Sequence, residues 1–279
     1  MNSVIGLLGN PLGHSISPVF QQAALDYYEL PIRYQPWQVD GNEIMGCVRQ
    51  LTSSRILGAN VTVPYKEVVG SLLDELTEEA GAIGAVNTIV NRDGVLVGYN
   101  TDGYAFLRAL REDVAFDPRA KTVLVLGAGG VARAIIFALA MAGVGTIILS
   151  NRTPARAQRL AQWASTWVKD IHVVDSQSLR LCEGWELVVN CTTVGMVFGN
   201  DENSTPIDTG LISRHALVYD LVYNPTETPL LKAAKEVGAE TLGGLSMLIY
   251  QGAESFRIWT GIDPSLEVMF KAARNALNP

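Results

Sequence analysis

The amino-acid sequence predicts an α/β protein of two domains, each built around a sheet that is mostly parallel. Three observations support this fold class. The chain has 279 residues, more than one domain usually holds. Apolar strands alternate with helix-like stretches through residues 1–100. The same alternation restarts near residue 104, and we place the domain boundary there.

Predicted strands and helices alternate along the first hundred or so residues. Apolar runs predict strands at residues 3–9, 32–39 and 56–63, and the stretches between them predict helices from Ser17 to about Tyr28 and near residues 42–53. Asp93-Gly94 lies between two β-rich runs and predicts a hairpin. Pro64 follows the third strand and suits the first position of another helix, which would place Lys66 in its first turn.

The second half opens with "KTVLVLGAGGVARAIIFALAMAG", which predicts a buried strand, a glycine turn and a helix. A second strand, "TIILSNR", follows, and strands and helices alternate to about residue 242. Residues 244–279 are helical by their periodicity.

Composition excludes several classes of function. Lys and Arg number 21 against 28 Asp and Glu, without a dense basic block, so neither nucleic acid nor an anionic membrane is an expected partner. Cys47, Cys182 and Cys191 are scattered, and we expect neither a metal site nor a disulfide framework. No apolar run reaches membrane-span length, and the N-terminal stretch lacks the basic region of a signal peptide. We therefore expect a cytoplasmic protein.

The glycine turn matches the G-x-G-x-x-G/A fingerprint of a Rossmann-like dinucleotide-binding domain. It reads Gly127-Ala128-Gly129-Gly130-Val131-Ala132 and lies between a strand and a helix, as the fingerprint requires. The free N–H groups and the dipole at the helix start would hold a pyrophosphate. The alternative is a glycine-rich turn that binds nothing.

The end of the second strand indicates the type of dinucleotide. NAD sites usually place Asp or Glu there, whereas NADP sites have Arg for the 2′-phosphate. Here the strand ends in Asn151-Arg152-Thr153, with Arg156 one turn further on and no carboxylate. This pattern favours NADP as the cofactor, and the alternative is that both arginines are ordinary surface charges.

Polar side chains in the first hundred residues predict a substrate pocket. Ser15 and Ser17 could receive a carboxylate or hydroxyl, although Ser17 could equally cap the following helix. Asn60, Thr62 and Lys66 surround the end of a strand, which is where ligands bind in open α/β sheets. Further polar residues are Asn87, which interrupts an apolar run, and Asn100, Thr101 and Asp102; Asp102 taken alone could be a turn or helix cap.

Eight stretches in order give the chain a family resemblance. They read "SISP", "GANVTVPYK", "GAVNTIV", "GYNTDGYAF", "GAGGVARA", "NRT", "NCTTVGM" and "GLSMLIYQGAESF", and together they resemble shikimate dehydrogenases over nearly the whole chain. The resemblance implies NADPH-dependent reduction of 3-dehydroshikimate to shikimate, a step toward aromatic amino acids. It also implies a discontinuous substrate domain of residues 1–102 and 238–279 around an NADP domain of residues 103–237.

The resemblance also implies roles for individual residues. Ser15, Ser17 and Tyr223 would hold the substrate carboxylate, and the groups around the ring hydroxyls would be Asn60, Thr62, Lys66, Asn87, Asp102 and Gln251. Cofactor contacts would come from Gly127, Ala128, Gly129, Gly130 and Ala132, from Asn151, Arg152 and Thr153, and from Gly244 and Met247. Gly243 departs from the polar residue that many members carry there.

Lys66 and Asp102 are the expected catalytic pair. Hydride transfer to a ketone leaves negative charge on oxygen, which a proton donor stabilises. Desolvation and a helix start would both lower the pKa of Lys66, whereas Asp102 would oppose them. The alternative for Lys66 is a side chain that reaches solvent.

Two other functions stay open beside the NADP-dependent enzyme, which would act on a small molecule as a monomer or homodimer. One is a quinate and shikimate dehydrogenase with relaxed substrate or NAD use. The other is a dinucleotide-binding regulator without catalysis, which would have no need of Lys66 and Asp102.

Overall fold

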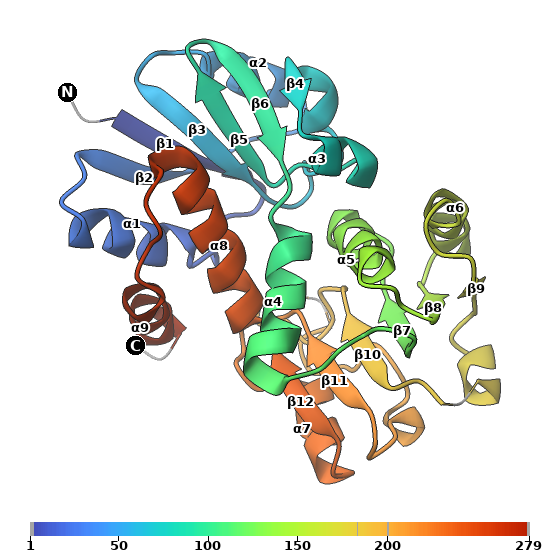
Figure 1. The fold of residues 1–279 in the computed structure, drawn as a ribbon. Helices are drawn as coiled ribbons and strands as arrows, with labels where there is room; N and C mark the ends of the chain where they lie inside the picture. Colours follow the sequence, from blue (N-terminus) through green and yellow to red (C-terminus); the bar gives the residue numbers. More distant parts are fainter. Residues whose placement is uncertain (1–2, 183, 200, 278–279) are drawn as a thin grey trace. The chain divides into compact units, whose positions relative to one another are not determined.

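The structure, a computed structural model, describes residues 3–182, 184–199 and 201–277. It divides into two compact units, Met1–Ala105 with Ile249–Pro279 and Phe106–Leu248. Each unit is built around a six-stranded sheet with helices, as Figure 1 shows. The predicted α/β class is confirmed. The expected ranges 1–102 and 238–279 begin and end on residues 1–2 and 278–279, which lie outside the described residues.

The sheet of the first unit is mixed. Its strands, in spatial order, are β2 (Ile32–Gln38), β1 (Ser3–Gly9), β3 (Ile56–Val61), β5 (Thr88–Arg92), β6 (Val95–Tyr99) and β4 (Glu75–Leu76). β1 runs parallel to β2 and β3, while β5 runs antiparallel to β3 and β6. The predicted hairpin joins β5 and β6, and Asp93 and Gly94 at its tip have φ values of 52° and 96°. Two positive φ values are what a tight type I′ turn needs.

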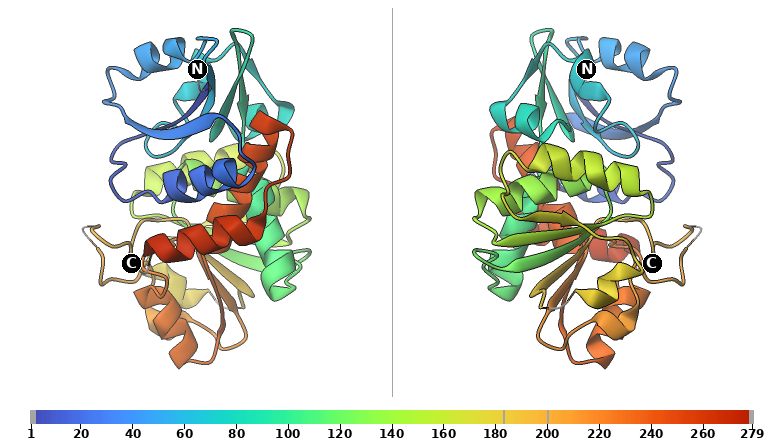
Figure 2. Two further views of the ribbon diagram at one scale, coloured as in Figure 1. Left: turned by 90° about the vertical axis from the view of Figure 1, so that its left-hand side faces the viewer. Right: turned by 90° about the vertical axis from the view of Figure 1, so that its right-hand side faces the viewer.

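Helices of the first unit come from both ends of the chain. α1 (Ser17–Tyr27) lies beside α9 (Leu266–Leu277), although almost the whole sequence separates them (Figure 2). The short helices α2 (Ile44–Gln50) and α3 (Glu78–Ile83) also belong to this unit. Two longer helices carry the chain from one unit to the other, α4 (Asp102–Val114) and α8 (Leu245–Thr260). The core includes Leu8, Val61 and Ile89 from three neighbouring strands.

The helix predicted to begin at Pro64 is wrong. The chain turns after β3, where Tyr65 N–H donates to Thr62 O, and the following helical segment is a short 3₁₀ helix at Val69–Leu72. Two contacts hold this turn: the buried Tyr65 hydroxyl donates to Val39 O, and Lys66 O accepts from Val86 N–H at 2.7 Å. Lys66 therefore lies in a turn and not in the first turn of a helix.

The second unit has the parallel sheet of a Rossmann-like domain. The strand order is β12 (Glu240–Gly243), β11 (Leu217–Asp220), β10 (Leu187–Asn190), β7 (Thr122–Leu126), β8 (Thr146–Ser150) and β9 (Ile171–Val173). All five strand pairs are parallel. Chain order reverses between β7 and β10, and this is the point where doubly wound sheets bind their ligands.

Helices α5 (Gly130–Met141), α6 (Pro154–Ala164) and α7 (Pro229–Glu236) pack on this sheet. Val188 and Val218 at mid-strand belong to its buried core, together with Leu230 and Leu231 of α7. β12 extends the sheet beside β11, so residues 240–243 lie in the second unit. This division differs from the boundary at residue 238 that the family resemblance implied, because β12 belongs to the second sheet.

Candidate active site

Lys66 and Asp102 form a nearly buried ion pair in the first unit. Lys66 Nζ lies 2.6 Å from Asp102 Oδ2, with side-chain exposures of 13% and 3%. The turn after β3 presents Lys66, and Asp102 opens α4, where a carboxylate suits the positive end of the helix. The side chain of Asp102 therefore pairs with a cation, and a simple capping role for Asp102 is not what the structure shows.

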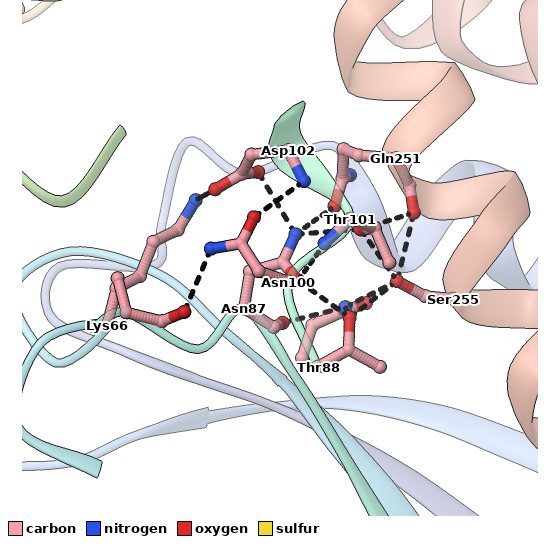
Figure 3. Close-up of polar contacts among 10 residues, drawn as sticks. Lys66, Asn87, Thr88, Asn100, Thr101, Asp102, Gln251 and Ser255 are labelled. Atoms are coloured by element: carbon pink, nitrogen blue, oxygen red, sulfur yellow. Dashed lines mark hydrogen bonds and ion pairs between the residues drawn. The ribbon is translucent and has the colours of Figure 1, made fainter. Parts of the chain in front are cut away.

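Asn87 orients the second oxygen of Asp102. Its Nδ2 donates to Asp102 Oδ1 at 3.0 Å and to Thr101 Oγ1 at 2.8 Å, while its Oδ1 accepts from Thr101 N–H at 2.9 Å. A carboxylate only accepts and a backbone N–H only donates. The Asn87 amide nitrogen must therefore face Asp102, and its oxygen must face the N–H of Thr101. Both oxygens of Asp102 are thus held, one by Asn87 and one by Lys66 (Figure 3).

Helix α8 brings Gln251 and Ser255 to the same group. Gln251 Oε1 lies 3.3 Å from Asn87 Nδ2, and Gln251 O accepts from the hydroxyls of Thr101 at 3.0 Å and Ser255 at 2.9 Å. Figure 3 shows the two side chains on one face of the helix, beside the residues of the β5 and β6 segment. Gln251 and Ser255 are four residues apart, which places them one above the other on a helix.

Asn60 joins the same polar group, and both ends of its carboxamide have hydrogen-bond partners. Its Nδ2 donates to Asn87 O at 3.0 Å and lies 3.1 Å from both Thr88 Oγ1 and Ser255 Oγ, and its Oδ1 accepts from the Tyr34 hydroxyl at 2.8 Å. Burial raises the pKa of Tyr34, which keeps this hydroxyl a neutral donor. The geometry favours a positioning role for Asn60 over the predicted contact with substrate.

Three members of this polar group were not predicted from the sequence: Tyr34, Thr88 and Ser255. Ser255 had a usable signal, because it follows Gln251 by one helical turn and so lies on the same face of the helix. Tyr34 and Thr88 had none, since aromatic and β-branched residues are common in any strand.

Ser15 and Ser17 lie at the start of α1. Ile16 is the N-cap of that helix and makes no side-chain capping bond, so Ser17 does not cap it. Ser15 Oγ accepts from Ser17 N–H at 3.4 Å, and the side chain of Ser17 is largely buried. Thr62 lies half-buried just beyond β3, with its N–H bonded to Leu8 O.

The glycine turn in the second unit has the geometry that the fingerprint requires. Gly127 has φ of 108°, and a Cβ there would lie 3.0 Å from Thr192 Cγ2 and 3.1 Å from the backbone carbon of Cys191. Gly129 is the N-cap of α5, and a Cβ added there would meet nothing within 4 Å. Ala132 is fully buried against the sheet. The backbone is therefore tight at the first glycine and open at the second.

These features fit a dinucleotide. The first-turn N–H groups of α5, from Gly130 onward, have no partners within the helix and the N-cap glycine lends no side chain, so an anion can approach them. Asn151, Arg152 and Thr153 follow β8 directly, as predicted, and Asn151 Nδ2 donates to Thr153 O at 2.9 Å. The adenosine end of NADP would lie here and the pyrophosphate on the glycine turn.

The remaining predicted cofactor and substrate residues lie beyond β11 and β12. Tyr223 follows β11 by three positions, and Gly244 and Met247 follow β12. A Cβ on Gly244 would lie 2.2 Å from Leu221 O, so this position requires glycine. The assigned contacts of these three residues stay predictions.

The part of the chain that the structure describes holds no group of three or more residues of the metal-ligating types close enough to bind an ion. In the same residues, each helix is too short or too polar to cross a bilayer. The three cysteines are free thiols, and burial raises the pKa of the Cys191 thiol.

Comparison with known proteins covers nearly the whole chain. Family models match residues 7–89 (shikimate dehydrogenase substrate binding domain), 110–204 (shikimate/quinate 5-dehydrogenase) and 244–274 (shikimate 5'-dehydrogenase C-terminal domain). The NADP(+) shikimate dehydrogenase of Methanopyrus kandleri is 41% identical, and the match spans 97% of this chain and 94% of that protein. The corresponding enzyme of Moorella thermoacetica is 42% identical over 98% of this chain and 93% of its own.

Solved structures show the same likeness. Shikimate 5-dehydrogenase of Thermus thermophilus, solved with NADP(H) and shikimate, has a TM-score of 0.88 and 37% identity, covering 99% of this chain and 100% of that one. Quinate dehydrogenase of Corynebacterium glutamicum, solved with NAD, has a TM-score of 0.87 and 31% identity, covering 98% and 99%. With such identity along its full length, the chain belongs to the shikimate dehydrogenase family.

Proposed function

We propose that this chain catalyses the reversible, NADPH-dependent reduction of 3-dehydroshikimate to shikimate. It is an oxidoreductase that acts on a CH–OH group, as its relatives are. The observation that supports this reaction best is the Lys66–Asp102 pair, 2.6 Å apart and held in place by Asn87. A member of the fold that only sensed dinucleotide would not need a nearly buried cation beside a buried carboxylate.

NADPH, when bound, supplies the hydride to the ketone carbon. Negative charge then develops on the ketone oxygen, and the ammonium of Lys66 is the proton donor for that oxygen. Asp102 holds the ammonium and compensates its charge in a site where side-chain exposure is 13% or less. In the oxidation of shikimate the neutral amine of Lys66 accepts the hydroxyl proton.

Asn87 and Gln251 complete the arrangement around Lys66 and Asp102. With Asn87 Nδ2 committed to Asp102 and Thr101, its remaining contact is with Gln251 Oε1 at 3.3 Å, longer than its other bonds. A substrate hydroxyl can replace this weak contact, and we assign the ring hydroxyls to Gln251, Asn87, Lys66 and Thr62. Ser15 and Ser17 bind the substrate carboxylate through their hydroxyls.

NADP is held by Gly127, Ala128, Gly129, Gly130 and Ala132 along the pyrophosphate and by Asn151, Arg152 and Thr153 at the 2′-phosphate. Arg152 and Arg156 are exposed at the start of α6 and no carboxylate ends β8, which supports NADP over NAD. The substrate is a small molecule, and we propose that the protein acts as a monomer or homodimer.

A second candidate is quinate oxidation with NAD, because a quinate dehydrogenase solved with NAD shares this fold at 31% identity. An acidic residue after β8 would favour it, whereas the chain has Asn151 and Arg152 there.

A spectrophotometric assay separates the candidates. NADPH consumption with 3-dehydroshikimate, and NADP+ reduction with shikimate, should proceed with kcat/KM at least about tenfold above those of the NAD and quinate reactions. Turnover that prefers quinate with NAD+ would establish the second candidate. Tight NADP+ binding without turnover of either substrate would contradict catalysis altogether.

A further inference from the structure

Two neighbouring strands of the second sheet, β10 and β11, end in polar residues that are paired with each other. Asp220, the last residue of β11, is paired in register with Asn190, the last residue of β10, and Asn190 is paired with Leu126 at the end of β7. Asp220 is also paired with Gly243 at the end of β12. The glycine turn begins directly after Leu126. Asp220 therefore lies in the row of strand ends from which the loops after β7, β10, β11 and β12 begin.

The carboxylate of Asp220 receives three hydrogen bonds. Oδ1 accepts from Asn190 Nδ2 at 2.8 Å and from Val222 N–H at 3.0 Å, and Oδ2 accepts from the Thr228 hydroxyl at 2.6 Å. Asp220, Asn190 and Thr228 are each 0% exposed. Burial of this carboxylate raises its pKa to about 6. A buried carboxylate without a cation beside it lowers the stability of the fold, and this cost indicates that Asp220 serves the function of the protein.

One connection runs from Asp220 to the glycine turn. Asn190 Oδ1 accepts from Thr192 N–H at 3.0 Å and from the Thr192 hydroxyl at 2.7 Å. Thr192 and Cys191 are the residues against which Gly127 is packed, since a Cβ on Gly127 would approach both within 3.2 Å. Asp220 thus holds Asn190 in place, and Asn190 holds Thr192, which packs against Gly127.

A second connection runs to Gly244. Asp220 holds Val222 N–H, and Val222 O accepts from Gly244 N–H at 3.3 Å. Gly244 packs so closely on Leu221 O that a Cβ would lie 2.2 Å from it. The loop after β11 is therefore placed between Asp220 on one side and Gly244 on the other.

We propose that Asp220 is a positioning residue for the dinucleotide, which sets the loops after β10 and β11 against the glycine turn and Gly244. The inference rests on the proposed function, since it assigns NADP to this edge. Asp220 acts through Asn190, Thr192 and Val222 and does not itself touch the cofactor. Its carboxylate suits the task because it can accept from several donors while donating to none.

The test compares two ligands in two variants and a control. Asp220→Ala removes all three acceptor contacts, and Thr192→Val removes the hydroxyl bond to Asn190 while keeping the side-chain shape and the backbone N–H bond. Leu187→Ala is the control for lost stability, because Leu187 is fully buried and begins β10, at the opposite end of the strand from Asn190. Calorimetry gives the Kd of NADP+ and of adenosine 2′-monophosphate, which lacks the pyrophosphate and the nicotinamide.

The Kd for NADP+ should rise about tenfold or more in Asp220→Ala and severalfold in Thr192→Val, because small displacements of a binding loop are costly. Binding of adenosine 2′-monophosphate should stay within about twofold, since the loops after β10 and β11 do not form its site. Leu187→Ala should change neither Kd.

Normal NADP+ affinity in both variants would overturn the inference, as would equal weakening of both ligands. If Asp220→Ala does not fold, Thr192→Val alone decides by the same criteria. A wild-type protein that fails to bind NADP+ would instead overturn the proposed function, and the inference with it.

Discussion

Two buried carboxylates, one in each unit, have opposite kinds of partner. Asp102 pairs with the ammonium of Lys66 at 2.6 Å, and Asn87 donates to its other oxygen. Asp220 accepts from an amide, a backbone N–H and a hydroxyl, all neutral. Both residues are at most 2% exposed. The two sites thus share burial and differ in the charge beside them.

The difference shows what burial of a carboxylate can be used for. Beside a cation with a remaining open surface, the carboxylate holds a proton donor ready for substrate. Among neutral donors it fixes the groups around it, and its pKa is raised as a result of burial. We therefore assign proton transfer to the first site and loop positioning to the second.

Removal of the cation should produce the largest effect. Lys66→Ala should lower kcat by roughly 10²–10⁴, the range for a positioned acid–base group, with KM changed far less. Lys121→Ala is the control, because Lys121 also forms a 2.7 Å ion pair, with Glu186, but is 40% exposed. Steady-state kinetics decides, and near-normal kcat in Lys66→Ala would remove the distinction between the two sites.

The pH dependence of stability should reveal the neutral surroundings of Asp220. Its pKa is raised from 3.8 to about 6, so between these values the folded protein binds more protons than the unfolded chain. Its contribution to stability therefore falls as pH rises from about 4 to about 6, by on the order of 3 kcal/mol at most, and stays level above that.

Urea unfolding of the wild type and of Asp220→Asn across this range measures the effect. The wild type should lose stability relative to the variant as pH rises. Asp170→Asn is the control, since hydrogen bonds from Thr146 and His172 lower the pKa of exposed Asp170 from 3.8, so its protonation affects stability only below about pH 4. A constant difference between wild type and Asp220→Asn from pH 4 to 7 would contradict the assignment.

Ser17→Ala should weaken binding of shikimate by roughly 1.5–3 kcal/mol, the value of hydrogen bonds to charged groups, and leave NADP+ binding unchanged. Stability should hardly change, because Ser17 does not cap α1. Thr77→Ala is the matched control: Thr77 does cap α3, accepting from Ala80 N–H at 3.2 Å, so its loss should cost about 1 kcal/mol of stability with KM unchanged. The reverse pattern would show Ser17 to be structural.

Arg152→Ala should give the smallest effect, because the residue is exposed. NADP+ binding should weaken severalfold while NAD+ binding stays the same, since NAD+ lacks the 2′-phosphate. Arg111→Ala, another exposed arginine, should change neither Kd. Equal losses for the two cofactors in Arg152→Ala would place the 2′-phosphate elsewhere.

The sequence was sufficient to predict features that depend on residues close to one another along the chain. Apolar periodicity predicted β1, β3, β7 and β8, and the glycine turn was identified from residues 127–132. Local reasoning failed at Pro64, because Tyr65 and Lys66 make contacts with Val39 and Val86 that hold a turn there. A proline suited to a helix start was outweighed by tertiary contacts.

The polar groups of both sites were much less predictable. Lys66 and Asp102 are 36 positions apart, and Asn60 and Ser255 are 195 apart, so spacing could not pair them. The family resemblance suggested Lys66 and Asp102, while Ser255 was missed. Asp220 and Asn190 were missed although each is a polar residue that ends an apolar strand, a pattern that predicts a role at the ligand-binding edge.

A double-mutant cycle on Lys66 and Asp102 tests the central claim, that the two residues act as one proton-transfer group. We would measure kcat for Lys66→Ala, Asp102→Asn and the double variant, with melting temperature as a check on folding. Groups that act as a unit are not additive, so the double variant should be about as slow as the slower single variant. Loss of activity in the double variant equal to the product of the two single losses would contradict the claim.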